Sequence, residues 1–487
     1  MKFVKIAFLL MTVFLVLTLA SCDNHTENAS DGLVFASNGD GTCVLKDLGS
    51  CKDTDIVIPS VSPDGDKVVG IAIGVFNQNE KITSVTIPAT VVEIYIKNFI
   101  YCDRLERIVV DSRNPVYYSE GNCLIERESK KLIAGCYTSV IPNGVVEIAS
   151  SAFARKSLLT SIDIPNSVKI INSNAFDDTA LTKIVLPAGV EYIEGGAFDY
   201  CSDLVEIVVD ADNPVYYSEG NCLIERESKK LIAGCHTSVI PDDVKSIATA
   251  AFQGCNKLEN ITIPEGIKEI GPLAFANCDS LVSVDIPNGV TSIGHNAFES
   301  CYNLTSVRLP DSVTSIGKAA FSNCPNLCSV NIPKGITCIQ AGTFGNCKSL
   351  NNVVIPDSVI SIESHAFGGC ISLERLEIPQ GVTSIGNRAF WGCQKIESLI
   401  LPEGLTEVSA ELLGVCHKLT QLHIPASVTT IENSALFCCC SLSDISFGGT
   451  MQQWEEIIKK GSYGQDPWYE SLRTTVVHCT DGDVPIK

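Results

Sequence analysis

The sequence predicts a solenoid of leucine-rich type, in which coils of 23 residues stack on one another. Two observations carry this prediction: phenylalanines recur every 23 residues, and a cysteine follows each of them three positions later. The series comprises Phe252, Phe275, Phe298, Phe321, Phe344, Phe367 and Phe390, with Cys255, Cys278, Cys301, Cys324, Cys347, Cys370 and Cys393. A third observation is the leucine or isoleucine three positions after each cysteine, because a fixed period of about 20 to 29 residues with such leucines is typical of leucine-rich repeats. One coil is too short to bury its own apolar face, so equivalent positions must form columns along the stack.

Each coil contains one clear strand signal. Ile261 and Ile263 alternate with the polar Asn260 and Thr262, which predicts a half-buried strand. Pro264 ends that strand because proline has no N–H for the ladder. The second apolar pair of a coil, such as Val290 and Ile293, fits the return path, and a glycine supplies the bend. We therefore expect parallel strands along one face of the solenoid.

The cysteine column allows a packed ladder of thiols, a set of disulfides or a metal site. Stacked strands lie roughly 4.8 Å apart, but pairing every neighbour would require backbone shifts at alternate steps. Each coil contributes one column sulfur, and no histidine accompanies it at ligand spacing. A free buried thiol packs as a small hydrophobe, so the packed ladder is the interpretation we favour.

The repeated unit also resembles a known family. Ala297-Phe298 and Cys301, followed by Leu304 and Pro310, resemble the BspA-type (or Treponema pallidum-type) leucine-rich repeat of bacterial surface proteins. The resemblance covers nearly all of the chain after its leader. It implies a curved solenoid that is used for binding, and it names no ligand.

Residues 1–21 are typical of a lipoprotein signal peptide. Lys2 and Lys5 precede a largely apolar run from Ile6 to Leu19 that is too short for a comfortable membrane span. Leu19-Ala20-Ser21-Cys22 resembles a bacterial lipobox, which implies cleavage before Cys22 and lipid attachment there; an ordinary secretory signal is the alternative. Residues 22–31 are polar and are predicted to form a flexible tether.

Composition agrees with export. Residues 1–21 hold two lysines and no acids, so the mature chain keeps 33 basic and 56 acidic residues and a net charge of −23. Nucleic acid and anionic lipid headgroups both require clustered Lys or Arg, so we expect neither as a partner. The membrane contact we predict is the lipid on Cys22 alone.

The two ends of the array are predicted to be caps. Residues 32–81 form an N-terminal cap and first coil, in which the turn signal Asn38-Gly39-Asp40-Gly41 predicts a β-hairpin. Cys43 and Cys51 either pair or stay free. Repeats fill residues 82–447, and residues 448–487 form a C-terminal cap. In that cap, Thr450 and Gln453 predict a capped helix that presents Trp454 on its apolar face.

Two inserts, residues 111–136 and 210–235, interrupt the repeats. Asn114–Cys136 recurs unchanged as Asn213–Cys235, at an offset of 99 residues. Each insert predicts a hairpin that turns at Ser129-Lys130 or its equivalent and bulges from the solenoid. This geometry allows the disulfides Cys123–Cys136 and Cys222–Cys235 in an exported protein. The tyrosines of the inserts either contact a partner or, as we favour, brace the hairpin; they are Tyr117, Tyr118, Tyr216 and Tyr217.

The sequence carries no motif that predicts catalysis. Its seven histidines are scattered, and it contains neither His-Glu-x-x-His nor a Gly-x-Ser-x-Gly elbow. We therefore predict no enzyme, no cofactor and no metal. The functional surface of a solenoid is normally its strand-lined face, where the outward residues that suit a protein partner are Arg308, Val354, Arg375, Glu377, Ile400 and His423.

These observations predict an exported protein, lipid-anchored to the bacterial outer membrane at the cell surface, that mediates protein binding or adhesion. A glycan-binding lipoprotein is one alternative, although the proposed outward columns contain no aromatic residue besides His423. A structural envelope component without a dedicated ligand is the other.

Overall fold

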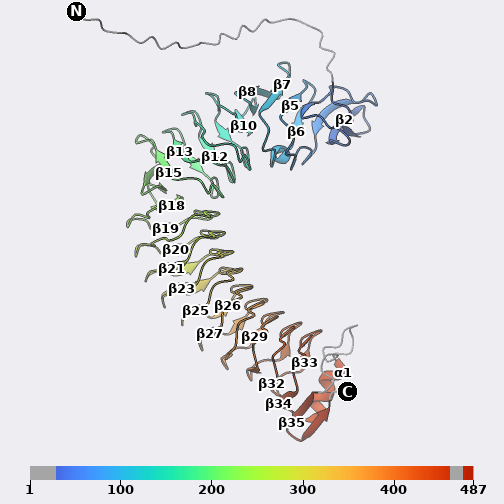
Figure 1. Cartoon of the computed structure of the whole chain (residues 1–487), viewed down its shortest axis with the longest axis vertical. Coiled ribbons are helices and arrows are strands. Elements are labelled where there is room, and N and C mark those ends of the chain that lie inside the picture. The colour runs from blue at the N-terminus through green and yellow to red at the C-terminus, as the bar shows by residue number, and fades with distance from the viewer. Residues whose placement is uncertain (1–28, 461–474, 486–487) are drawn as a thin grey trace, which may run out of the picture.

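The computed structural model describes residues 29–460 and 475–485 and shows the predicted solenoid. The coils stack into an open, curved arch with the N-terminal cap at one end and the C-terminal cap at the other (Figure 1). Each regular coil makes a first strand, turns, makes a second, shorter strand, and turns again past its phenylalanine and cysteine. The apolar columns fill the space between these segments, so the core is as elongated as the stack.

The first strand of each coil forms a column that we call the front series. Its strands pair in parallel, with Ser283 beside Ser306 and Val284 beside Val307. The series comprises β3 (Asp55–Val57), β5 (Ser84–Ile87), β7 (Arg107–Val110), β13 (Lys183–Leu186), β15 (Glu206–Val209), β21 (Ser283–Asp285), β23 (Ser306–Arg308), β25 (Ser329–Asn331), β27 (Asn352–Val354), β30 (Ser398–Ile400), β32 (Gln421–Ile424) and β34 (Asp444–Phe447). These are the parallel strands that the apolar alternation predicted.

The return path adds a second column of parallel strands, which the sequence analysis did not predict. This return series comprises β6 (Glu93–Ile94), β11 (Glu147–Ile148), β12 (Ile170–Ile171), β14 (Tyr192–Ile193), β19 (Ser246–Ile247), β20 (Glu269–Ile270), β22 (Ser292–Ile293), β24 (Ser315–Ile316), β26 (Cys338–Ile339), β28 (Ser361–Ile362), β29 (Ser384–Ile385), β31 (Glu407–Val408) and β33 (Thr430–Ile431). Stacked backbone must satisfy its N–H and C=O groups, and the neighbouring coil supplies the partners. Figure 1 labels β21, β23, β25 and β27 along one side of the arch and β26, β29 and β33 along the other.

The phenylalanine column is confirmed. From Phe252 to Phe390, each ring stacks on the next with centroids 5.0 to 5.9 Å apart and planes within 18° of parallel. All of these rings are buried. Leu413 and Leu436 continue the column where the phenylalanine is replaced, and both are fully buried.

The cysteine column is a ladder of thiols, as the favoured interpretation predicted. Cys278 Sγ donates to the carbonyl oxygen of Phe252 in the preceding coil at 3.2 Å, and the same bond recurs up to Cys439 at 3.0 to 3.4 Å. Burial raises the pKa of the Cys278, Cys370 and Cys393 thiols, which keeps them protonated and able to donate. All cysteines that the structure describes are free thiols, including those of the three candidate disulfides.

The inserts differ from the simple bulging hairpins that we predicted. The turn at Ser129-Lys130 is present between β9 (Cys123–Glu126) and β10 (Lys131–Ala134), but β8 (Tyr117–Glu120) adds a third strand through a turn at Gly121-Asn122. The sheet does not bulge, because β10 pairs in parallel with β11 and so joins the stack. The second insert repeats the arrangement with β16 (Tyr216–Glu219), β17 (Cys222–Glu225) and β18 (Lys230–Ala233).

Each insert sheet divides the core. Leu124 and Ile133 pack with the N-terminal core, whereas Ile125 and Leu132 on the opposite face pack with the next core segment. The second insert sheet separates the second core segment from the third in the same way. This explains why the apolar run of the insert is buried on both faces.

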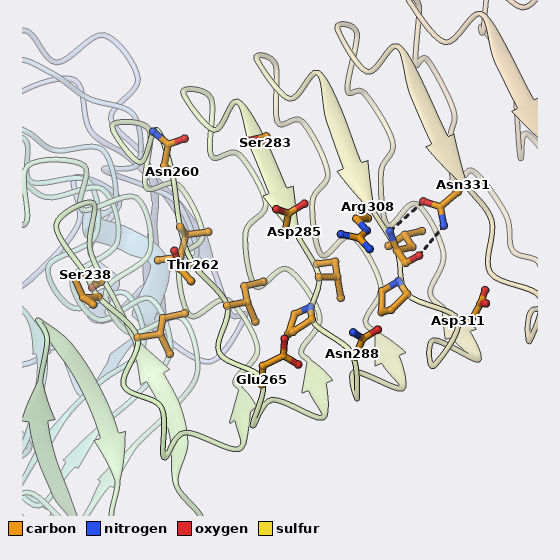
Figure 2. A pocket seen from close by; sticks show the side chains of 18 residues that line it. Ser238, Asn260, Thr262, Glu265, Ser283, Asp285, Asn288, Arg308, Asp311 and Asn331 are labelled. Atoms are coloured by element: carbon orange, nitrogen blue, oxygen red, sulfur yellow. Dashed lines mark hydrogen bonds between the residues drawn. The ribbon is translucent and has the colours of Figure 1, made fainter.

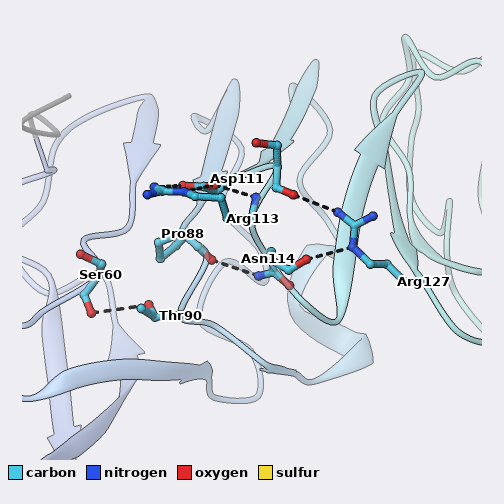
Figure 3. A network of polar contacts seen from close by, with 8 residues as sticks. Ser60, Pro88, Thr90, Asp111, Arg113, Asn114 and Arg127 are labelled. Atoms are coloured by element: carbon cyan, nitrogen blue, oxygen red, sulfur yellow. Dashed lines mark hydrogen bonds and ion pairs between the residues drawn. The ribbon is translucent and has the colours of Figure 1, made fainter. Parts of the chain in front are cut away.

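A buried asparagine anchors each insert to the coil before it. Asn114 Nδ2 donates to the carbonyl oxygens of Pro88 and Val91 at 3.0 and 2.7 Å, and Oδ1 accepts from the amides of Val116 and Tyr117. Arg127 Nε donates to the Asn114 carbonyl at 2.9 Å (Figure 3). Asn213 makes the same set of bonds in the second copy.

The first insert also breaks the cysteine ladder. Lys156 stands three residues after Phe153, where the repeat has cysteine, and is 1% exposed. Its Nζ donates to the Phe99 carbonyl at 2.6 Å. Phe99 ends the short 3₁₀ helix η1 (Ile96–Phe99) on the far side of the insert sheet. The longer side chain therefore reaches a carbonyl that lies beyond the inserted strands.

The N-terminal cap forms the predicted hairpin, between β1 (Val34–Ser37) and β2 (Thr42–Asp47), with β4 (Lys67–Ile71) beside it. Ser30 was predicted to lie in the flexible tether, but it is 8% exposed and its amide donates to the Val57 carbonyl. The described chain is thus packed against the cap from this residue onward.

The C-terminal cap contains the predicted helix α1 (Met451–Lys460), whose Trp454 and Ile457 are buried. Thr450 and Gln453 exchange the predicted capping-box bonds. Strands β35 (Val476–Cys479) and β36 (Gly482–Pro485) then extend the front series beyond β34.

Candidate binding surface

The front series presents an outward surface of alternating residues. In β21, β23, β25 and β27 the central residue is buried and the residues on either side are exposed. All six predicted side chains lie on or beside strands of this series. Two of them are large apolar side chains in contact with solvent, Val354 at 70% exposed and Ile400 at 61%.

Arg308 lines a groove of about 950 Å³ on this surface (Figure 2). Its neighbours in register are Asp285 on one side and Asn331 on the other. Asn331 is fixed, because its Nδ2 donates to the Leu309 carbonyl at 2.6 Å and its Oδ1 accepts from the Leu309 amide. Arg308 forms no ion pair within the part of the chain that the structure describes, so its guanidinium is available to a ligand.

Val354, Arg375 and Glu377 line a second groove of about 660 Å³. Lys395 and Glu374 at its rim pair with each other at 2.9 Å. Residues that follow the strands, among them 287–288 and 310–311, line the first groove. Residues that precede the strands, including Ser349 and Asn351, line the second. Together the grooves follow a diagonal path across the front series.

Ile400 and His423 lie on the next two strands, β30 and β32, and are partners in the strand register. His423 Nδ1 lies 3.1 Å from Ser446 Oγ, and its Nε2 lies 3.9 Å from Glu403. The structure therefore divides the six predicted residues into Arg308 in the first groove, three residues in the second, and an apolar and a histidine position beyond it.

The family to which the repeats belong follows from their residue pattern. The family described as "BspA type Leucine rich repeat region" matches this chain over residues 51–126, 134–233, 230–351 and 337–462. The chain is a BspA-type leucine-rich repeat protein. A comparison with curated proteins gives no significant match.

Several solved structures of leucine-rich repeat proteins are similar to this BspA-type protein. One, from Bacteroides ovatus, is 25% identical, with 88% of this chain and 96% of the other covered and a TM-score of 0.48. A leucine-rich cell surface protein from Faecalibacterium prausnitzii is 25% identical, with 90% and 98% covered and a TM-score of 0.35. The leucine-rich repeat protein of T. pallidum is 27% identical, with 47% and 82% covered and a TM-score of 0.29.

The tyrosines of the inserts in this BspA-type array fall into two classes. Tyr117 and Tyr216 are 7% and 3% exposed, and Tyr216 Oη accepts from the Ile193 amide at 3.1 Å. Their rings face the core and brace the inserts, which is the interpretation that we favoured for them over contact with a partner. Tyr118 and Tyr217 lie at the surface, where Arg127 and Lys229 approach their rings to 5.2 and 4.7 Å.

Cys22, the predicted lipidation site of the BspA-type protein, lies outside the described residues. Among the described residues, no helix is both long enough and apolar enough to cross a membrane, and no cluster of side chains is suited to hold a metal ion. Lipid attachment at Cys22 therefore stays a prediction.

Two exposed aromatic residues at one position of the BspA-type repeat, Trp391 and Phe437, were not predicted to be functional. Each directly follows a column residue and lies on a turn, outside the strands of the front series. The signal was available in the repeat itself, because most other coils have a small or polar residue at that position.

Proposed function

We propose that this BspA-type protein is exported, lipid-anchored through Cys22 at the bacterial cell surface, and binds a protein partner along the front series. The partner would lie as an extended segment along the diagonal path from the first groove to the second. The observation that carries this proposal is the combination of Arg308, Val354 and Arg375 along that path. Neither arginine forms an ion pair within the described residues, and Val354 is the most exposed large apolar side chain there.

The mixture of groups favours a protein over a uniform polymer. Interfaces between proteins are enriched in arginine and combine apolar contacts with a polar rim. The grooves supply the rim with Asn331, Glu377 and the Lys395–Glu374 pair. A stacked array of coils holds these groups on a rigid support, so little conformational entropy is lost on binding.

The binding proposal is tested with the mature chain carrying Cys22→Ser, first against candidate host and bacterial proteins and then by titration with each captured protein. We expect Arg308→Ala and Arg375→Ala each to weaken binding at least tenfold. Arg104→Ala is the matched control, because Arg104 is also exposed but lies far from the front grooves. Unchanged affinity in Arg308→Ala, Arg375→Ala and His423→Ala would reject this surface as the binding site.

The export and anchoring proposal has a separate test. Mass spectrometry of the N-terminal peptide should show a lipid-modified Cys22, and Cys22→Ala should release the protein from the membrane fraction. Protease treatment of intact cells should degrade the repeats if they are displayed outside. An unmodified cysteine with an intact leader, or full protection from protease, would contradict anchoring or display respectively.

A further inference from the structure

The position directly after the column phenylalanine has a different character near the C-terminal end of the array. In successive coils from Phe252 to Phe367 this position is held by small or polar residues: Gln253, Ala276, Glu299, Ser322, Gly345 and Gly368. Trp391 and Phe437 then replace them with large aromatic rings. Both are in contact with solvent, at 37% and 50% exposed. An exposed aromatic side chain at a position that the repeat keeps small serves no packing purpose in the core.

The indole of Trp391 lies against a glycine of the neighbouring coil. A Cβ atom at Gly414, the equivalent position one coil further on, would lie 2.8 Å from Trp391 Cδ1 and 3.3 Å from its Nε1. The indole therefore rests directly on the Gly414 backbone, and only glycine permits this contact. Within the described residues, Trp391 Nε1 has no hydrogen-bond partner. The ring thus offers an open surface and a free N–H donor.

The backbone between the two aromatic residues is strained. Val415 has a φ of 65°, a left-handed conformation that is a genuine outlier for a β-branched residue. Other coils place glycine, asparagine or another unbranched residue at this turn position. Strain of this kind costs about 1 to 3 kcal/mol and gathers at functional sites. The Val415 amide donates to the Phe437 carbonyl at 2.6 Å. Ile371, which is 38% exposed, lies two residues after Gly369, whose amide donates to the Trp391 carbonyl at 2.6 Å.

The charged groups near this patch are paired with one another. Arg388, three residues before Trp391, forms an ion pair at 2.5 Å with Glu411, three residues before Gly414. This cation and this anion neutralise each other beside the indole, which favours a neutral ligand at Trp391 over an ionic one. The patch is also small, because it contains four apolar side chains, whereas each side of a stable protein interface contains about 20 to 30 residues. A second copy of the chain would therefore not be held here.

We propose that Trp391 and Phe437 form a platform that binds a neutral oligosaccharide through the apolar faces of its sugar rings. Aromatic rings present flat, polarizable faces for such stacking, and the hydroxyl groups of the ligand can accept from Trp391 Nε1. The two rings lie two coils apart, roughly 10 Å along the stack. A linear oligosaccharide can contact both, whereas a monosaccharide reaches one. This site is independent of the protein-binding grooves on the front series.

The test is calorimetric titration of the purified full chain with neutral oligosaccharides: maltohexaose, cellohexaose, xylohexaose and chitohexaose. We expect at least one to bind, at least tenfold more tightly than its monosaccharide. Trp391→Ala and Phe437→Ala should each weaken that binding at least tenfold, and Trp391→Phe should retain most of it. Tyr302→Ala is the matched control, because Tyr302 is an aromatic residue that is 49% exposed on the turn after Cys301 and lies several coils away from the platform.

Three results would overturn the proposal. They are the absence of binding to all four oligosaccharides, equal binding by the wild type and both alanine variants, and an equal loss in Tyr302→Ala. Circular dichroism of each variant verifies the fold. The oligosaccharide binding that Trp391→Phe is expected to retain separates loss of the platform from loss of structure. Self-association that depends on Trp391 would assign the patch to a second copy instead.

Discussion

Asp199 is a buried carboxyl group whose ionisation should destabilise the fold as pH rises. It is 6% exposed, and burial, followed by the nearby Asp177, raises its pKa from 3.8 to about 8. Because the folded-state pKa lies above the unfolded value, the folded chain holds a proton that the unfolded chain releases. The resulting loss in the free energy of unfolding is absent below pH 4 and grows between pH 4 and pH 8.

The magnitude follows from the difference in pKa. One pKa unit corresponds to about 1.36 kcal/mol, so the penalty at pH 7 is at most about 4 kcal/mol. Asp199→Asn removes the titration but introduces an amide that needs hydrogen-bond partners, at a cost of about 1 to 3 kcal/mol. Because the cost of the amide does not depend on pH, we expect the stability of Asp199→Asn relative to wild type to rise by up to about 4 kcal/mol between pH 4 and pH 7. At pH 7 the variant should then be about 1 to 3 kcal/mol more stable than wild type.

The assay is hydrogen exchange of peptides covering residues 190–205, combined with urea unfolding, at pH values from 4 to 8 after correction for the intrinsic exchange rate. Wild-type protection of these peptides should fall with rising pH, and that of Asp199→Asn should fall less. Asp163→Asn is the control, because Asp163 is exposed. A difference between wild type and Asp199→Asn that stays constant over this range would refute the reasoning, since it would show that ionisation at this site does not contribute.

Three further substitutions test the packing of the stack, each by urea or thermal unfolding. Phe298→Ala removes one ring from the stacked column and should cost about 3 to 5 kcal/mol; Phe298→Leu should cost much less, since Leu413 fills the same position naturally, and equal losses would argue against a packed column. Asn114→Ala leaves two carbonyls and two amides of the first insert without partners and should cost at least about 3 kcal/mol, so a neutral effect would contradict its anchoring role. Gly135→Ala would place a Cβ atom 2.0 Å from the Phe153 ring; it should destabilise the chain by at least about 1 to 3 kcal/mol, and an unchanged midpoint would show that the ring moves freely.

The repeat predicted the core better than it predicted the inserts. Phe298 and Cys301 recur in every regular coil, so one periodicity placed both in columns. The third insert strand was missed, because Tyr117–Glu120 lacks a clear apolar alternation. The turn before Cys123 offered a signal, since Gly121 and Asn122 both adopt positive φ, at 56° and 58°, and such residues favour a two-residue hairpin.

The candidate surface was predictable in its residues but not in its shape. Alternation along the strand indicated that Arg308 and Val354 point outward. The grooves depend on how each coil sits against the next, and a single 23-residue unit does not encode that offset. The aromatic platform required comparison of one column along the whole chain, because Trp391 is notable only against the small residues that precede it.

The insert sheets have a consequence for how such a protein can change in length. Each is apolar on both faces, so it finishes one core segment and starts the next. An array that ends at such a sheet needs only one apolar face covered, and two sheets of the same sequence are interchangeable. The 99-residue block between the copies can therefore be gained or lost as a whole, with every neighbouring coil meeting the same surface as before. Recombination between the identical stretches would vary the length of the array while leaving its terminal caps intact.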